Sequence, residues 1–281
     1  KVTASTKNVT FGSTYGELPT PTRSGYTFAG WWTAVDSGEQ INAESVVKTA
    51  SDHVLYAHWV LNSVSVSYQT HVANIGWQNG VSNGAMAGTV GRGLQLEAIK
   101  INVKSDADIG VIYTTHVKND GWHGNSFNGE QSGTTGQNKH VEALMLKLTG
   151  KDADKYDIYY RVHAQNYGWL AWAKNGESAG TSGYAYRLEA IQIVVTAKGD
   201  MAPTVFYGGY TSNNAKAYIS KTSTVPIINT NASVRYQSHV SNIGWQNAVA
   251  DGALAGTTGR ALNVEAINMS LTGEMANQYD I

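Results

Sequence analysis

The amino-acid sequence predicts an all-β protein with a small N-terminal domain and a larger repetitive region. Three observations lead to this prediction. Glycine is enriched, at 30 of 281 residues, while charged residues make up 15% of the chain, against about 25% in an average globular protein. Several segments alternate apolar and polar residues with the period of a half-buried strand. One pattern of residues also occurs four times at fixed spacing, as in proteins built from repeated supersecondary units.

Residues 1–61 form the first predicted domain. Proline and glycine separate its short strands, and Trp31 and Trp59 supply most of a small core. The stretches GELP at 16–19, GYTFAGWW at 25–32 and LYAHW at 55–59 resemble the Listeria–Bacteroides repeat, also called the internalin B-repeat. The resemblance implies a β-grasp, ubiquitin-like fold that serves as a spacer in bacterial surface proteins. Its usual first strand is missing before Val9, so we expect the sequence to start inside this domain.

Residues 62–200 contain three copies of the repeat, and residues 232–281 contain a fourth. Each copy is centred on a tryptophan, with a Tyr nine and a His six residues before it, a Gly-Thr pair eleven residues after it and a Glu twenty residues after it. The four sets are Tyr68, His71, Trp77 and Glu97; Tyr113, His116, Trp122 and Glu142; Tyr160, His163, Trp169 and Glu189; and Tyr236, His239, Trp245 and Glu265. Three such units favour a pseudo-threefold β-prism, with a β-trefoil as the alternative.

Two strands are predicted in each copy. In the segment 63–72, strict alternation places Tyr68 on the apolar face and His71 on the polar face. In the segment 97–103, the same period places Glu97 with the apolar residues. A buried carboxylate must be hydrogen-bonded, and we expect the Gly-Thr turn and the Tyr phenol to bond it. The four glutamates and four tyrosines are therefore interpreted as structural, and each His as lying on a different face from its Glu.

The candidate ligand-binding residues are His71, Trp77, His116, Trp122, His163, Trp169, Trp172, His239 and Trp245. Each His shares its strand face with polar residues that can hydrogen-bond a hydroxyl-rich ligand. The alternative is that the tryptophans are core residues and that neighbouring strands cover the histidines. We expect the copies to leave comparable polar patches outside a shared core.

The repeat resembles the clostridial hydrophobic repeats named for their tryptophan, the ChW repeats, through GWLAWA at 168–173, AGTSG at 179–183 and RLEAIQI at 187–193. This family implies a secreted or cell-surface protein of clostridia and relatives, with a role in adhesion. The second tryptophan of the motif is present only as Trp172. Residues 201–231 read as a linker. The fourth copy reads as the start of a second triplet, poorly ordered or completed by a neighbouring chain.

The sequence disfavours several functions. A net charge of −1 offers no basic surface for nucleic acid, and no apolar run is long enough to cross a bilayer. Catalytic motifs and cysteine are absent, and a His on the opposite face from the Glu disfavours an acid–base pair. We therefore expect no enzyme activity, no cofactor and no metal site, and an export or anchoring signal outside this sequence.

Two functions remain open. One is an adhesion module of a Gram-positive cell surface that binds glycans or cell-wall polymers through several sites. The alternative is a structural spacer or assembly module that docks other proteins within a large surface protein. The expected partner is therefore a glycan or cell-wall polymer, or a host or bacterial surface protein.

Overall fold

The computed structural model describes residues 5–200, 212–221, 233–250, 254–258 and 260–272. The chain divides into two compact units. The first comprises Lys1–Val64 with Ser105–Asp108, and the second comprises Ser65–Lys104 with Ile109–Ile281. The described residues are all-β apart from one short 3-10 turn, η1 (Ala153–Lys155), which confirms the predicted class.

The N-terminal unit contains a three-stranded antiparallel sheet in the order β2-β1-β3, with β1 (Tyr26–Trp32), β2 (Gln40–Ile41) and β3 (Tyr56–Leu61). Tyr15, Ile41 and Val47 form its buried core, against which Trp31 packs. Trp59 meets the edge of Phe28, with ring centroids 5.4 Å apart. The described part of this unit contains no helix.

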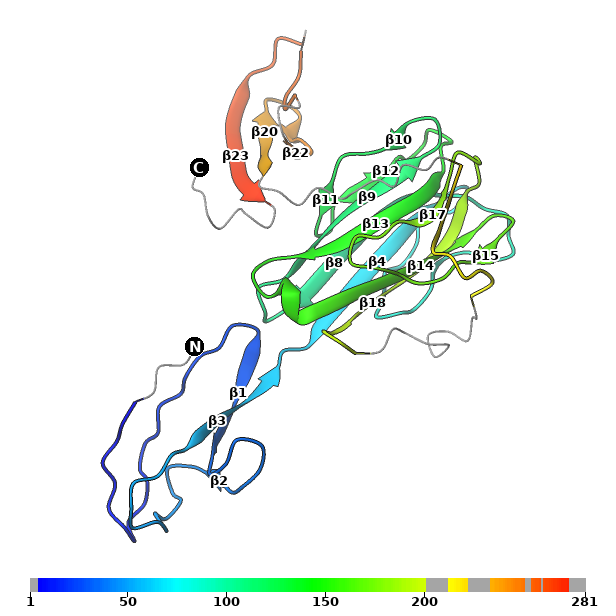
Figure 1. The fold of residues 1–281 in the computed structure, drawn as a ribbon. Helices are drawn as coiled ribbons and strands as arrows, with labels where there is room; N and C mark the ends of the chain where they lie inside the picture. The colour runs from blue at the N-terminus through cyan, green and yellow to red at the C-terminus, as the bar shows by residue number, and fades with distance from the viewer. Residues whose placement is uncertain (1–4, 201–211, 222–232, 251–253, 259, 273–281) are drawn as a thin grey trace. The chain divides into compact units, whose positions relative to one another are not determined.

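The second unit contains the repeats (Figure 1). Copy one has β4 (Val64–Val72), β5 (Gly76–Trp77), β6 (Val81–Ser82), β7 (Ala87–Gly88) and β8 (Leu96–Ser105). Copy two has β9 (Gly110–Val117), β10 (Gly121–Trp122), β11 (Ser126–Phe127), β12 (Gln131–Gly133) and β13 (Val141–Thr149). Copy three has β14 (Tyr156–Ala164), β15 (Gly168–Trp169), β16 (Ala173–Lys174), β17 (Ala179–Ser182) and β18 (Leu188–Ala197), followed by β19 (Tyr218–Ser220). Copy four has β20 (Ser233–Val240), β21 (Gly244–Trp245), β22 (Val249–Ala250) and β23 (Val264–Thr272).

The first three copies exchange one short strand in a closed cycle. The two long strands of each copy pair with each other, and the two short strands after the first long strand pair along its other edge. The strand that carries the glycine eleven residues after the tryptophan instead pairs with a strand of a neighbouring copy: β7 pairs with β18, β12 with β8, and β17 with β13. Each of the three sheets therefore contains strands from two copies, and no copy is complete by itself.

Each exchanged strand presses a glycine against an alanine of the neighbouring copy. Gly88 lies opposite Ala190, and the same pairing joins Gly133 to Ala98 and Gly180 to Ala143. A Cβ atom on Gly88 would lie 2.3 Å from the backbone oxygen of Glu189. This approach, together with a φ of +107°, excludes a side chain at Gly88.

The apolar faces of the long strands make one interior shared by the three copies. Its central residues are at most 1% exposed: Val66, Ile99, Ile101, Val111, Leu144, Leu146, Ile158, Ile191 and Ile193. The tyrosines also lie there, as predicted, but their hydroxyls cross between copies. Tyr68 accepts a hydrogen bond from the N–H of Ile193 in copy three, at 3.1 Å, and donates to the carbonyl of Ala85.

Candidate functional site

A β-bulge brings the repeated His and Glu together. In copy three the pairing of β14 with β18 passes from His163 opposite Ala190 to Ala164 opposite Leu188, so Glu189 is an extra residue. The same shift occurs at Glu142 in copy two and at Glu265 in copy four. Because a bulge changes the direction of side chains that strict alternation would fix, the Glu turns to the face of the His.

Each copy consequently contains a His–Glu–Trp cluster. The distance from His Nδ1 to Glu Oε2 is 3.1, 3.0, 3.1 and 2.9 Å in copies one to four. In copy four this contact has hydrogen-bond geometry, whereas in the other copies Nδ1 lies close to the carboxylate but off its hydrogen-bond direction. The edge of the Trp ring meets the imidazole, with centroids 5.3 to 5.6 Å apart.

This cluster corrects two predictions. The His and Glu were expected on different faces, which was an argument against an acid–base pair, but they lie in contact because the bulge breaks the alternation. The Glu was also expected to bond the Gly-Thr turn and the Tyr phenol through its carboxylate. The turn instead bonds the backbone of a Glu in the neighbouring copy: the Thr89 N–H donates to the Glu189 carbonyl at 2.8 Å. The phenol of Tyr68 bonds other groups.

The charges in the clusters follow from burial and pairing. Burial raises the pKa of Glu142, but the close contacts with the His116 and His140 side chains outweigh it and lower that pKa to about 2. Burial lowers the pKa of His163 below its usual value, against the opposing charge of Glu189. At neutral pH, Glu142 is therefore ionised and His163 is neutral. A proton on the Nδ1 of His163 faces the carboxylate and leaves Nε2 as an acceptor.

The tryptophans of the four clusters differ in exposure. Trp77 and Trp122 are half-buried, Trp169 is 3% exposed and Trp245 is 52% exposed. The structure thus places only Trp245 as an open ring, although the sequence pattern treats the four alike.

A segment of the predicted linker covers the tryptophan of the copy-three cluster, while the His163 side chain stays about as exposed as His71 in copy one. This segment, residues 212–221, is called the strap; the rest of the linker lies outside the described residues. Its strand β19 runs parallel to β17, and Asn213 bonds both backbone groups of Trp169, with its N–H donating at 2.6 Å and its Oδ1 accepting at 3.0 Å. The Gly180 N–H donates to Ala217 at 2.9 Å. The strap therefore occupies the surface where a ligand of copy three was expected.

Trp172 belongs to this covered surface. The Arg161 guanidinium lies 4.8 Å from the ring centroids of both Trp169 and Trp172. Arg161 is 2% exposed, and its Nε donates to Gln192 Oε1 at 2.8 Å. Burial lowers the pKa of this guanidinium. In this structure Trp172 thus stacks on a buried cation of its own chain.

Copy one keeps an open polar surface at the corresponding place. Its Gly88 N–H donates to the side chain of Gln78 at 3.0 Å, whereas copy three has Leu170 at the position of Gln78. The glutamine thus supplies the acceptor that the strap supplies in copy three. Because this glycine is already bonded within its own copy, copy one needs no covering segment.

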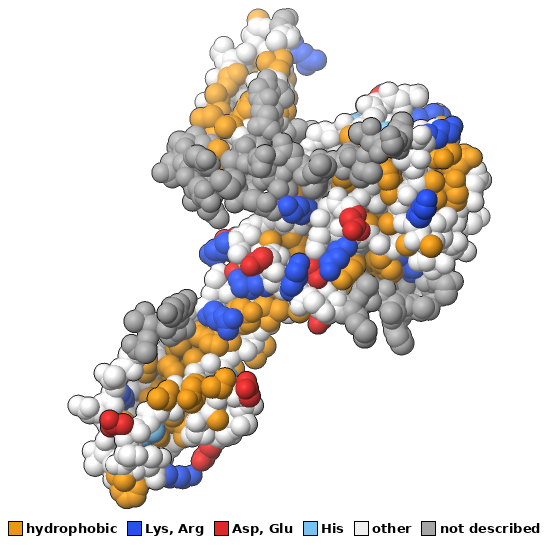
Figure 2. Space-filling model, in the orientation of Figure 1, with side chains coloured by type: hydrophobic (Ala, Val, Ile, Leu, Met, Phe, Trp, Pro, Cys, Tyr) orange, Lys and Arg blue, Asp and Glu red, His pale blue; other side chains and the backbone are white. Residues whose placement is uncertain are grey.

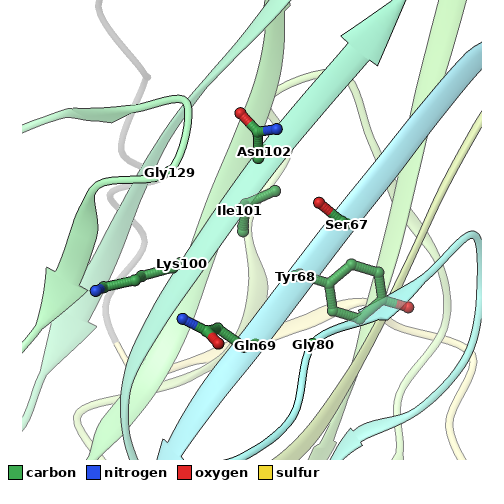
Figure 3. Close-up of a pocket in the computed structure, with 8 residues that line it drawn as sticks. All are labelled: Ser67, Tyr68, Gln69, Gly80, Lys100, Ile101, Asn102 and Gly129. Carbon is green, nitrogen blue, oxygen red and sulfur yellow. The ribbon is translucent and has the colours of Figure 1, made fainter.

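The open surface of copy one is hollowed. Figure 3 shows its lining side chains on the neighbouring strands β4 and β8. The lining residues are Ser67, Tyr68, Gln69, Gly80, Lys100, Ile101, Asn102 and Gly129. Lys100 also places its ammonium 4.8 Å from the centre of the Trp77 ring. We call Ser67, Gln69, Lys100 and Asn102 the polar hollow; its lining includes neither His71 nor Glu97.

The outer surfaces of the copies are not equivalent, contrary to the prediction of comparable polar patches. In copy two, Ile112 and Met145 are buried in an apolar cluster with Trp122 and Phe127. They stand at the positions that Ser67 and Lys100 occupy in copy one. Copy four is polar again, with Gln237, Asn268 and Ser270 at the positions of Gln69, Lys100 and Asn102.

Sequence reasoning missed Lys100 and Asn102 as candidate residues. The signal was present, because they alternate with the buried Ile99, Ile101 and Val103 and must point outward. Within the described part of the chain, no group of three or more His, Cys, Asp or Glu side chains could hold a metal ion. None of the described helical segments has the length and apolar character needed to cross a membrane.

Comparison with known protein families gives matches over most of the chain. The family described as clostridial hydrophobic W (ChW) matches residues 71–105, 116–150, 163–197 and 239–273. The Listeria-Bacteroides repeat domain matches residues 1–58. No curated protein and no solved structure matches the chain.

Proposed function

Since the chain consists of a Listeria-Bacteroides repeat domain followed by four ChW repeats, we propose that it is a non-catalytic adhesion module of a bacterial cell surface. Its ligand is a glycan or cell-wall polymer, and its location is extracellular, on a Gram-positive cell. The observation that carries this proposal is the polar hollow of copy one beside the Trp77 ring.

The polar hollow has the chemistry that a hydroxyl-rich polymer requires. Gln69 and Asn102 each offer amide donors and a carbonyl acceptor, and Ser67 offers a hydroxyl. Lys100 supplies a positive charge that favours a polymer with negative groups. A half-buried tryptophan beside these groups provides an apolar surface for the carbon skeleton of a sugar ring.

The number of sites is smaller than the number of repeats. Copy three is covered by the strap, and copy two has an apolar outer surface. Copies one and four have the polar residues, so the proposed binding is bivalent. When one weak site has bound a repetitive polymer, the second site on the same chain meets that polymer at a high effective concentration, so the two sites together bind more tightly than either alone.

A binding experiment with paired lysine variants tests this function. The chain is mixed with purified Gram-positive cell walls and titrated with defined cell-wall oligosaccharides. We expect Lys100→Ala to weaken binding several-fold, while Lys104→Ala, an exposed lysine further along β8, leaves it unchanged. Equal binding by wild type and Lys100→Ala, or no binding to any cell-wall material, refutes the proposal.

A protein-docking function is the second candidate, and the apolar surface of copy two favours it. The partly buried rings of Trp122 and Phe127, packed against the buried Ile112 and Met145, give this copy a surface better suited to a protein than to a sugar. If Phe127→Lys abolishes capture of a surface-protein partner while cell-wall binding stays absent, the docking function replaces the adhesion function.

The proposal includes the architecture on which these surfaces lie. We infer a domain of residues 1–61 with the β-grasp, ubiquitin-like fold of its family, a three-repeat domain of residues 62–200, a linker of residues 201–231 and a fourth repeat in residues 232–281. Three sheets related by cyclic strand exchange favour a β-prism over a β-trefoil.

A further inference from the structure

The fourth repeat exposes the apolar face that the other three repeats bury. Val264, Ile267 and Met269 on β23 are 51%, 62% and 55% exposed. The residues at the same positions in copies one to three are all 0% exposed: Leu96, Val141, Leu188, Ile99, Leu144, Ile191, Ile101, Leu146 and Ile193. Figure 2 shows hydrophobic side chains at the surface of this repeat. Exposed apolar side chains of this size are costly in water, which favours a partner for this face.

The first three copies show what covers this face. In each of them the glycine strand of another copy pairs with the long strand that carries the apolar residues. The tyrosine of the same donor copy then accepts a hydrogen bond from the backbone of that strand, as Tyr113 does from the Ile101 N–H at 3.1 Å. The covering element is therefore another ChW repeat.

The fourth repeat has both halves of this exchange. Gly256 has a φ of +127°, close to the +122° of Gly180, although the nearest atom to a Cβ built there is 3.8 Å away. Ala266 stands where an incoming glycine would pack, and Tyr236 stands where the bridging tyrosine is needed. A unit with a donor segment and an acceptor strand can bind copies of itself head to tail.

We propose that the fourth repeats of three chains join in a closed ring, with the same cyclic strand exchange that joins copies one to three within a chain. The segment around Gly256 in each chain adds as a short strand to β23 of the next chain, with Gly256 opposite Ala266. The exchange contacts are the same as those between copies one to three. They therefore rotate each repeat relative to the next by the same angle, and the ring closes after three repeats. The inference does not depend on the proposed glycan binding.

Sedimentation of the full chain over a range of concentrations tests the ring. The wild-type mass should rise from the 30.2 kDa of one chain to that of three chains, about 91 kDa. Ile267→Asp should keep the chain monomeric over the same range, and the folded repeat tolerates this change because Ile267 is solvent-exposed. The matched control, Val35→Asp, alters a residue of similar exposure, 61%, in the N-terminal unit and should trimerise like wild type.

A second variant covers the case in which Ile267→Asp unfolds the repeat. Tyr236→Phe preserves the shape of the side chain and removes the bridging hydroxyl, so it should raise the concentration needed for trimerisation several-fold while the circular dichroism of the monomer is unchanged. A wild-type chain that stays at one mass at all concentrations overturns the proposal. Assembly that stops at two chains, or continues without closing, overturns it as well.

Discussion

Replacing Tyr113 with Phe tests whether the three copies are held together by hydroxyls that cross between them. The ring of Tyr113 is fully buried, and its oxygen accepts from the Ile101 N–H of copy one at 3.1 Å while donating to the Glu130 carbonyl of copy two. Burial raises the pKa of this phenol well above its usual value, so it remains a neutral donor at all working pH values.

The size of the effect follows from the two groups that lose their partner. The N–H of Ile101 becomes a buried unpaired donor, which costs about 1–3 kcal/mol. The Glu130 carbonyl is only partly buried, and its lost hydrogen bond adds about 0.5–1.5 kcal/mol. Because Phe fills the same space, no cavity forms. The free energy of unfolding should therefore fall by about 1.5–4.5 kcal/mol.

Denaturant unfolding followed by near-ultraviolet circular dichroism measures this change, and the midpoint should fall with an unchanged slope. Hydrogen exchange locates it, since the Ile101 amide in the other copy should lose protection. Tyr184→Phe is the control, because Tyr184 is half-exposed and its ring stacks on Tyr186. A loss below about 0.5 kcal/mol, within the range of ordinary surface substitutions, refutes this account, as does full protection of the Ile101 amide.

Three further predictions concern packing, pH and the strap. Gly180→Ala should destabilise the chain by about 2 kcal/mol more than Gly256→Ala does. Both glycines have positive φ values, but of these two only Gly180 would bring a Cβ against a backbone atom, at 2.4 Å. Equal melting temperatures of the two variants would contradict this prediction. The pKa of Glu142 is lowered from 4.5 to about 2, so its contribution to stability is fully present above pH 4.5 and is lost as pH falls toward 2. Melting temperature measured against pH should show this loss in wild type and a smaller one in Glu142→Gln; parallel curves would exclude it. Arg161→Ala should release the strap, seen as faster proteolysis within residues 212–221, and an unchanged cleavage rate would show that the strap does not depend on this cation.

The strand content and the buried face were predictable because they depend on local periodicity. Val66 and Tyr68 alternate with Ser65 and Ser67, and the structure buries the first pair. The position of the Glu was not predictable in this way. A bulge adds one residue to one strand of a pair, and the sequence 188–191 reads as continuous alternation whether or not the partner strand skips Glu189.

The strand exchange was outside the reach of sequence reasoning for a different reason. The exchanged strands have only two to four residues, too few to show a period, and their partners lie far away in the chain: Gly88 pairs with Ala190. A glycine at this spacing indicates a close backbone approach, but it cannot say to which copy.

The difference between the outer surfaces of the copies, in contrast, was predictable from the sequence. Ser67, Ile112 and Tyr159 stand at one outward position, and Lys100, Met145 and Gln192 stand at another. The prediction of comparable patches rested on the Tyr, His, Trp and Glu spacing that the copies share, and not on these variable outward residues.

The exchange explains why the shared and the variable residues separate so cleanly. The inward positions of the long strands are buried in the interior that three copies share, so a change there must fit more than one copy, and Ile99, Leu144 and Ile191 remain similar in size. The outward positions lie outside this interior, although some of them reach another copy, as Gln192 does by donating to the Gly84 carbonyl of copy one at 2.8 Å. One scaffold can therefore hold a polar hollow, an apolar cluster and a strap-covered cation on successive copies. Recognition in this chain depends on the residues that the repeat motif does not specify, and variants of Lys100 or Phe127 should change binding without changing the fold.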